Sequence, residues 1–391
     1  MSSPKDIMDF CWVGRQLENF LGCLKEDPDL DPKDIATEKI SKRHENLFQS
    51  YYLEEKRYDT AKDTIDRVRE FMGRVAPRHF REPFLNALLE YEWLAHAKIK
   101  VAEESKPPKL YRDHILHPAA VCAIGWWMMN SGALPELELQ KIAGNLRDKY
   151  DSVFPGMDWE DIAKRAWIIA SLTHDLLYPV EFLLKLNDPI FDNPPIVSKS
   201  RIVLSHAEQI RNETTTKIFR RSVNKKILKE TISGGRHIHS VLGALFLLDS
   251  HSDYKSTTLR RKIILELAAS AIFFHHAHDK ERICFKSNPL GCLLALADNC
   301  HEFGREYLIW SIYEKKRISE FIPPIPHSYI ETRSPDDYCL HLAWNDPDKI
   351  EKLKKEENGF NPDVFIEDKV KFFELFQNPA DNGFTFNMQI D

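Results

Sequence analysis

Apolar segments with helical spacing recur through the middle of this chain, and metal-binding side chains stand at their ends. Between Tyr111 and about Ile312 one such segment follows another, interrupted mainly by the proline-containing loop NDPIFDNPPIVSKS. Apolar residues that repeat every three to four positions mark one buried face of a helix, so this region is predicted to be a helical bundle. The residues beside the helix ends are His117, His174, Asp175, His239, His275, His276 and Asp298.

Composition divides the chain into three parts. Residues 1–105 show helical spacing without obvious chemistry, and the turn-rich EESKPPK follows at their end. Residues 106–320 form the predicted bundle. Beyond FIPPIP, the segments YCLHLAW and FTFNMQI are typical of short strands, and KIEKLKK and VKFFELF between them are typical of helices. The predicted fold is therefore mainly α, with an N-terminal helical extension over residues 1–105 and a small α+β appendage over residues 321–391.

Charge and cysteine content exclude several classes of protein. The chain has 391 residues with 54 basic and 60 acidic side chains, a formal charge of −6, so no overall attraction to DNA or to a membrane is expected. The opening MSSPKDIMDF does not resemble a secretory signal, and no stretch approaches the roughly 18 apolar residues of a membrane span, so a cytoplasmic protein is expected. The seven cysteines are never spaced C-x-x-C, which argues against a disulfide framework and a thiolate zinc site. They are expected to be reduced and mostly buried.

The first two candidate positions lie at opposite ends of their helices. His117 precedes Pro118, a residue that fits only the first turn of a helix, so His117 is predicted near a helix start. His114 is an alternative ligand one turn earlier, and a capping or core histidine is an alternative role. The dyad His174-Asp175 follows the apolar run IAKRAWIIASLT, and Asp158 and Asp161 signal the start of that helix. A carboxylate at the edge of a core is costly to desolvate unless a cation balances its charge.

The remaining candidates follow the same pattern. His239 begins an apolar helix, His237 two residues earlier must point elsewhere, and Gly243 one turn later would let another helix approach closely. His275-His276 follows IILELAASAIFF, where a frayed polar helix end is the alternative interpretation. Asp298 lies in a helix that Asn288 and Pro289 are predicted to start. Arg236, before His239, is a candidate for holding a phosphate oxygen, with a surface cation at a helix start as the alternative. Arg305 shares a helix face with Asp298 and Glu302, so it is expected either to pair with Glu302 or to orient Asp298.

In its order H, HD, H, HH, D, this set resembles the two-metal branch of the HD-domain metal-dependent phosphohydrolases, over roughly residues 111–312. The resemblance implies an HD-domain-like helical bundle and two divalent ions, one held by His117, His174 and Asp298 and the other by His239, His275 and His276. Asp175 would bridge the two. Imidazole and carboxylate ligands suit Mn, Fe, Co, Ni, Zn and Mg alike.

The resemblance further implies hydrolysis of a phosphoester, of a nucleotide or cyclic nucleotide, by water that the metal activates. Asp175, His239 and Arg236 are the expected catalytic residues, and Arg236, Tyr178 and Arg305 are expected to contact substrate. Gly-Tyr-Pro does not follow the HH pair as it does in the HD-GYP branch, and Tyr178 stands where that branch tends to have lysine. Cyclic di-GMP is therefore not specifically indicated.

Two alternatives stay open from the sequence. One is a mononuclear-metal dNTP triphosphohydrolase, in which His239, His275 and His276 are catalytic or structural. The other is a catalytically silent nucleotide-sensing module. No stable binding of duplex nucleic acid is expected, and assembly into a homo-oligomer is left open.

A basic surplus marks the segment from Arg201 to Arg236. A solvated helix face is the favoured interpretation, and a rim that attracts a polyanionic nucleotide is the functional one. The cations named for this segment are Arg211, Lys217, Arg220, Arg221, Lys225, Lys226, Lys229 and Arg236.

Overall fold

The computed structural model describes residues 111–112, 116–175, 177–178, 199–233, 238–249, 258–276, 284–301, 307–308, 327–343, 362–377 and 382–390. These residues are mostly helical, with one three-stranded sheet near the C-terminus, which confirms the mainly α prediction. Residues 1–105, predicted as helices, lie outside the described residues. Among the described helices, none has the length and apolar character needed to cross a bilayer.

The chain forms two compact units. Residues Leu137–Leu296 make up one, the helical unit, and Met1–Glu136 together with Ala297–Asp391 make up the other, the composite unit. The three-part division predicted from the sequence, with boundaries near residues 105 and 320, stays a prediction.

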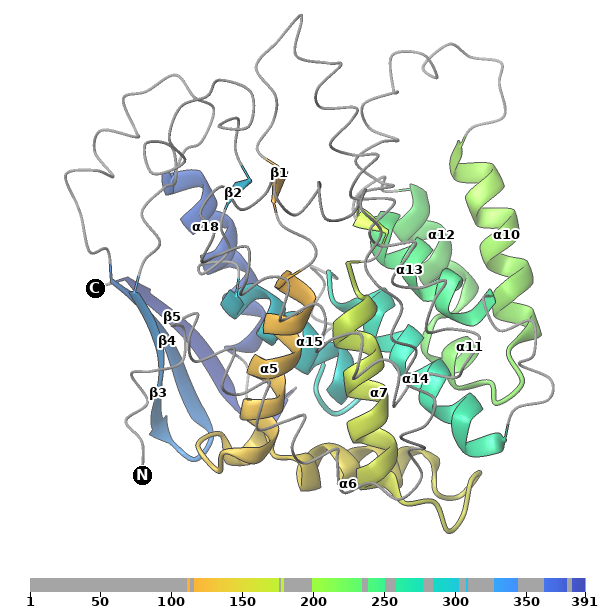
Figure 1. The fold of residues 1–391 in the computed structure, drawn as a ribbon, viewed down its shortest axis with the longest axis horizontal. Helices are drawn as coiled ribbons and strands as arrows, with labels where there is room; N and C mark the ends of the chain where they lie inside the picture. Colours follow the sequence, from red (N-terminus) through yellow and green to blue (C-terminus); the bar gives the residue numbers. More distant parts are fainter. Residues whose placement is uncertain are drawn as a thin grey trace, which may run out of the picture. The chain divides into compact units, whose positions relative to one another are not determined.

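Helix α14 (Leu259–Phe274) lies at the centre of the helical unit, where it packs on α7 (Trp159–Thr173), α13 (Ile238–Asp249) and α11 (Ile218–Ser222) (Figure 1). Its residues from Ile263 to Phe274 are all buried and, apart from Glu266 and Ser270, apolar, as expected of a helix that neighbours surround. This unit also contains α6 (Leu139–Tyr150), α10 (Lys199–Glu213), α12 (Lys225–Ser233) and the part of α15 (Pro289–His301) up to Leu296.

The start of α7 follows the sequence prediction. Asp158 is its N-cap, and the Asp158 carboxylate accepts a hydrogen bond of 3.1 Å from the backbone N–H of Asp161. Such a cap satisfies one of the N–H groups that a helix start leaves without an intrahelical partner. The helix then ends at Thr173, with His174 as its C-cap, so the predicted position of the dyad at the end of this helix is confirmed.

Two buried charged side chains hold the segment around α11 by long-range contacts. Glu266 on α14 is fully buried and accepts hydrogen bonds from the backbone N–H groups of Thr216 (2.9 Å) and Phe219 (3.1 Å). Arg211 is 7% exposed and donates to the carbonyl oxygens of Val223 (2.5 Å) and Arg220 (3.2 Å). The placement of Arg211 on a solvated basic face is therefore wrong, because its guanidinium supplies donors that these carbonyl oxygens need.

The other named cations of that segment that the structure describes follow the favoured interpretation, and Arg236 lies outside the described residues. Six of them are exposed to solvent along α11 and α12 and the turns beside them, and two lie near acidic partners. Lys226 is 3.9 Å from Glu230, and Lys225 is 4.0 Å from Glu208. The exposed cations are Lys217, Arg220, Arg221, Lys225, Lys226 and Lys229.

The composite unit contains α5 (Leu116–Asn130), the 3-10 turn η3 at the junction (Pro135–Leu137), and the last turn of α15 (Pro289–His301). Two short strands pair in it, β1 (Tyr111–Arg112) and β2 (Tyr307–Leu308). The start of α15 follows its predicted signals: Asn288 accepts from the Gly291 N–H at 3.2 Å, and Pro289 is the first helical residue. Pro118 lies in the first turn of α5, as predicted.

The C-terminal part of this unit is a small α+β layer. Strand β4 (Asp337–Ala343) pairs antiparallel with β3 (His327–Ser334) and parallel with β5 (Thr385–Ile390). The parallel pair requires a crossover between β4 and β5, which contains α18 (Pro362–Phe373) and the 3-10 turn η6 (Glu374–Phe376). The strands predicted in YCLHLAW and FTFNMQI and the helix predicted in VKFFELF are confirmed; β3 was not predicted, and KIEKLKK lies outside the described residues.

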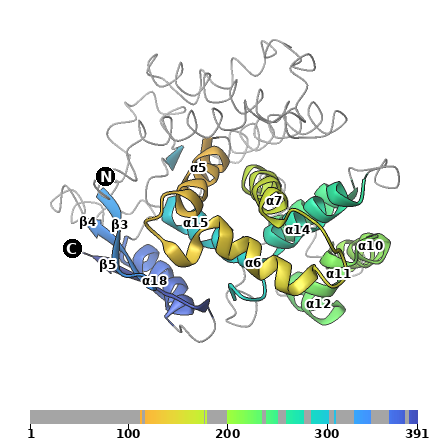
Figure 2. The same cartoon turned by 90° about the horizontal axis from the view of Figure 1, so that it is seen from below.

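Aromatic residues form the core between α18 and the sheet, with α18 lying along β5 (Figure 2). The rings of Phe373 and Phe386 stack with centroids 5.5 Å apart, and Tyr338 packs against Phe386 at 6.0 Å. Two hydrogen bonds tie this layer to the segment after α5: Glu136 N–H donates to the Tyr338 hydroxyl at 3.1 Å, and the Thr332 hydroxyl donates to the Ala133 carbonyl at 2.7 Å. The appendage therefore packs as part of the composite unit.

Candidate metal centre

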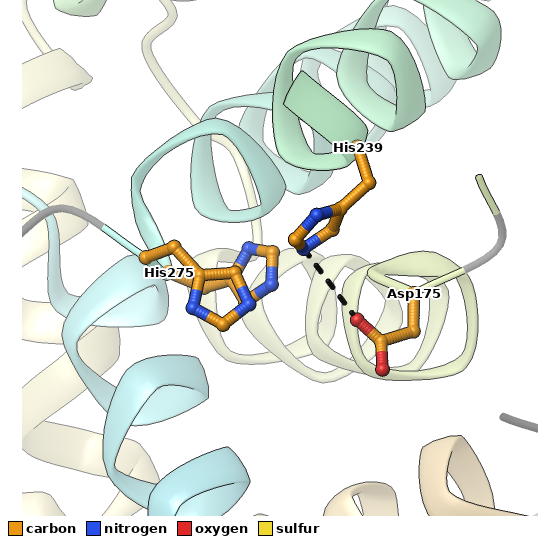
Figure 3. Close-up of side chains that lie close together, drawn as sticks. Asp175, His239 and His275 are labelled. Carbon is orange, nitrogen blue, oxygen red and sulfur yellow. Dashed lines mark ion pairs between the residues drawn. The ribbon is translucent and has the colours of Figure 1, made fainter. Parts of the chain in front are cut away.

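Four metal-binding side chains converge in the helical unit from the ends of three helices. Asp175 follows α7, His239 is in the first turn of α13, and His275 and His276 follow α14. One ligand atom from each of the four lies within 4.8 Å of the others, close enough to hold a metal ion. Figure 3 shows His239, His275 and Asp175 coming from these three elements toward one point. For convenience we call these four residues the four-ligand group.

Contacts between the side chains fix the arrangement of this group. The Nε2 atom of His239 is 3.7 Å from Asp175 Oδ1 (Figure 3). The Nε2 atom of His174 is also 3.7 Å from that oxygen. The rings of His275 and His276 have centroids 4.0 Å apart, and each meets His239 edge-on, at 5.7 and 4.8 Å. One carboxylate oxygen thus lies between two imidazoles.

Backbone carbonyl groups select the tautomer of two of these histidines. His174 Nδ1 is 2.7 Å from the Ser171 carbonyl oxygen, and His275 Nδ1 is 2.5 Å from the Ile272 carbonyl oxygen. A carbonyl oxygen only accepts, so each Nδ1 carries the proton and donates it. The lone pair of a neutral ring is then on Nε2. Metal-binding histidines commonly have this arrangement, in which the second ring nitrogen donates to a carbonyl or carboxylate.

The donor chemistry fits a divalent ion of the first transition series. Asp175 is 3% exposed, His239 is 1% exposed and His275 is fully buried. A buried carboxylate is desolvated, and a cation beside it offsets the cost. Three imidazoles with one carboxylate suit Zn, Mn, Fe, Co and Ni, and two carboxylate oxygens allow Asp175 to contact more than one ion.

A second pair of predicted ligands meets in the composite unit. His117, in the first turn of α5, and Asp298, near the end of α15, lie with Nε2 and Oδ1 2.8 Å apart. His117 is fully buried and Asp298 is 3% exposed. The prediction that both belong to one ligand set with His174, which lies in the helical unit, stays a prediction.

His301 is buried in contact with His117 and was not predicted from the sequence. Its Nδ1 is 2.7 Å from His117 Nδ1, and the two rings stack with centroids 5.0 Å apart. Part of this arrangement could be read from the sequence, because His301 is three residues after Asp298 and therefore on the same face of α15. The sequence did not indicate that His117 on α5 lies against this face.

Of the predicted substrate contacts, the structure describes one. Tyr178 is half-buried, its N–H donates to the Asp175 carbonyl at 2.9 Å, and its ring meets the His239 ring edge-on at 5.1 Å. Tyr178 therefore borders the four-ligand group. Arg236, Arg305 and the alternative ligands His114 and His237 lie outside the described residues.

Gly243 allows the close helix packing behind the site, as its position predicted. A Cβ atom there would lie 3.3 Å from Ile272 Cγ2 and 3.6 Å from the His174 carbonyl oxygen. A side chain would thus press on α14 and on the end of α7, the two helices that carry His275 and the dyad.

The cysteines of the described residues play no part in this donor set. Cys122, Cys292, Cys300 and Cys339 are buried, Cys284 is half-buried, and none of these five forms a disulfide, as predicted. Burial raises the pKa of the Cys300 thiol well above its ordinary value, and burial does the same for Cys292. Both are therefore neutral thiols near pH 7, whereas a cysteine ligand is a thiolate.

Comparison of the chain with protein-family models, with curated proteins and with solved structures finds no match. The interpretation of the site therefore depends on its geometry and on the sequence pattern.

Proposed function

We propose that this protein is a metal-dependent phosphohydrolase that acts on a nucleotide or a cyclic nucleotide. The observation that carries the proposal is the four-ligand group, in which Asp175 and three imidazoles converge from three helix ends. The order of these residues with His117, His174 and Asp298 along the chain, which resembles that of the two-metal HD-domain phosphohydrolases, supports the reaction class.

His239, His275 and His276 would hold one divalent ion, and His117, His174 and Asp298 would hold a second in the arrangement that the resemblance implies. When bound, divalent cations supply hydroxide near neutral pH by lowering the pKa of water, and they neutralise phosphoryl oxygens as charge develops on them. The protein has to keep the imidazole lone pairs directed at one point, which the carbonyl bonds of His174 and His275 do in the helical unit.

Asp175 would bridge the two ions. Its Oδ1 lies at the same distance, 3.7 Å, from His174 Nε2 and His239 Nε2, which belong to the two proposed ligand sets. Tyr178 would contact the substrate from the edge of the group, because its ring lies against His239 and is partly exposed. Arg236, two residues before α13, would add a charge for a phosphate oxygen.

Replacing Asp175 by alanine tests the proposal. Asp175→Ala should abolish phosphohydrolase activity and most metal binding while the helical circular dichroism spectrum stays that of wild type, because Asp175 lies beyond the last residue of α7. Asp148→Ala is a matched control, since Asp148 is an exposed aspartate on α6 of the same unit. A folded Asp175→Ala protein with wild-type activity would contradict the proposal.

The substrate is identified by a screen of the metal-loaded wild-type protein. Cyclic dinucleotides, deoxynucleoside triphosphates and a generic phosphodiester are the three substrate groups to compare, each with Asp175→Ala in parallel. Turnover of any of these by wild type alone supports the hydrolase and names its substrate class. Tight nucleotide binding with no turnover under any metal would instead support a nucleotide-sensing module.

A further inference from the structure

His301 is held in direct contact with His117 although nothing in the sequence pattern assigns it a role. The two Nδ1 atoms are 2.7 Å apart, His117 is fully buried and His301 is 7% exposed. The rings are stacked, with an interplanar angle of 29°. Asp298, one helical turn before His301 on α15, meets the other nitrogen of the same ring, Nε2, at 2.8 Å.

One proton is shared between two ring nitrogens in this contact. At 2.7 Å one Nδ1 must donate and the other must accept, because two protons, or two lone pairs, would repel each other. Asp298 Oδ1 only accepts and lies 2.8 Å from His117 Nε2, so without an ion Nε2 would donate to it. When an ion is bound by both atoms, Nε2 must offer its lone pair, and a neutral His117 then carries its proton on Nδ1. His117 is then the donor, and His301 accepts with its Nδ1 and carries its own proton on Nε2.

Two other described histidines of the site, His174 and His275, show why His117 needs such a partner. His174 and His275 follow their helices, so each donates to the carbonyl of the residue three positions earlier in its own helix, Ser171 or Ile272. His117 is the second residue of α5, so no turn of its own helix precedes it. An acceptor from another helix has to take the place of that carbonyl, and His301 is placed to do so.

We propose that His301 is a positioning residue, which fixes the Nδ1–H tautomer and the ring orientation of His117 so that Nε2 is presented as a metal ligand. The inference rests on the proposed function in one respect, namely that His117 binds a metal. It adds a role for a residue outside the predicted ligand set. Partners of this kind typically change metal affinity by about 10- to 100-fold.

Two substitutions of His301 in the full-length protein separate positioning from packing. His301→Leu removes the acceptor, whereas His301→Asn retains one, because its side-chain oxygen stands as many bonds from Cα as Nδ1 does in histidine. His341→Leu is the control, since His341 is also buried in the composite unit and bonds to Glu331 at 2.9 Å instead. Zinc affinity is measured by competition with a chromogenic chelator, and the hydrogen-bonded Nδ1–H of His117 by NMR of the zinc-loaded protein with nitrogen-15-labelled histidine.

The expected result is a zinc affinity about 10- to 100-fold weaker for His301→Leu, with loss of the slowly exchanging Nδ1–H signal of His117 in the zinc-loaded protein. His301→Asn should keep that signal and lose less affinity, and His341→Leu should match wild type. If His301→Leu does not fold, loss of the signal in a folded His301→Asn protein overturns the role. If wild type binds zinc and folded His301→Leu binds it with the same affinity, the role of His301 is overturned but the proposed function is not. A wild-type protein that binds no metal overturns the proposed function and this inference with it.

Discussion

The two units hold their proposed metal-binding histidines in different ways. In the helical unit His174 and His275 donate to carbonyl oxygens three residues earlier, so each is oriented by its own helix. In the composite unit His117 is held by Asp298 and His301, which are more than 180 residues away in the sequence. Helix C-termini provide acceptors locally, because their last carbonyl groups lack intrahelical partners, whereas a helix N-terminus provides only donors.

The same contrast between local and long-range contacts appears in the framework of the helical unit. Asp158 caps α7 from the adjacent residue, whereas Glu266 binds the start of the α11 segment from about 50 residues away. Substitutions at these positions test whether the long-range contacts contribute more to stability than the local ones. The expected effects are in each case changes in the free energy of unfolding, measured by denaturant titration.

The largest loss of stability is expected for Glu266→Ala. It would leave the N–H groups of Thr216 and Phe219, both in buried residues, without this acceptor, at about 2–5 kcal/mol in total. Glu230→Ala is the control, because Glu230 is an exposed glutamate on α12, and it should stay within about 0.5 kcal/mol of wild type. Equal unfolding midpoints for the two variants would show that the buried carboxylate contributes little.

A smaller loss is expected for Gly243→Leu. The new side chain meets Ile272 and the backbone of His174, and overpacking of this kind costs about 1–3 kcal/mol. Metal affinity should fall as well, since the ends of α14 and α7 carry proposed ligands. Gly144→Leu offers the comparison, because a Cβ atom at Gly144 has no neighbour within 4 Å. A Gly243→Leu protein as stable as Gly144→Leu would mean that the helices around the site are not closely packed.

The smallest of these losses is expected for Asp158→Ala. Removal of a single helix cap typically costs about 1 kcal/mol, and Asp148→Ala, an exposed position in the last turn of α6, should cost less. Metal content should stay that of wild type, because the cap is at the opposite end of α7 from the dyad. Should Asp158→Ala destabilise the protein more than Glu266→Ala, the contrast between local and long-range contacts would be contradicted.

The sequence was most informative where structure is local. The caps Asp158 and Asn288, the place of His174 at the end of α7, and two strands of the small sheet all follow from short-range patterns. Strand β3, HSYIETRS, has few apolar residues, so alternation did not reveal it. The burial of Arg211 and the contact of His301 with His117 depend on how helices pack against one another, and no short-range pattern carries that information.

The seven proposed ligands illustrate the same limit. Their positions beside helix ends are a property of the sequence, and the convergence of Asp175, His239, His275 and His276 is a property of the packing of α7, α13 and α14. The small residue at Gly243 is the one sequence feature that indicated this packing.

The account is tested most directly by counting metal ions per chain in wild type and in the double variant His275→Ala/His276→Ala. Each protein is stripped with a chelator, reloaded with zinc or manganese, desalted and subjected to elemental analysis, with circular dichroism to confirm folding. The account predicts about two ions per wild-type chain and about one per folded double variant, because an ion site rarely survives the loss of two of three imidazoles. One ion per chain in both proteins, with only the hydrolysis rate reduced in the variant, would contradict it. Those histidines would then be acid-base groups, and deoxynucleoside triphosphates would become the first substrates to test.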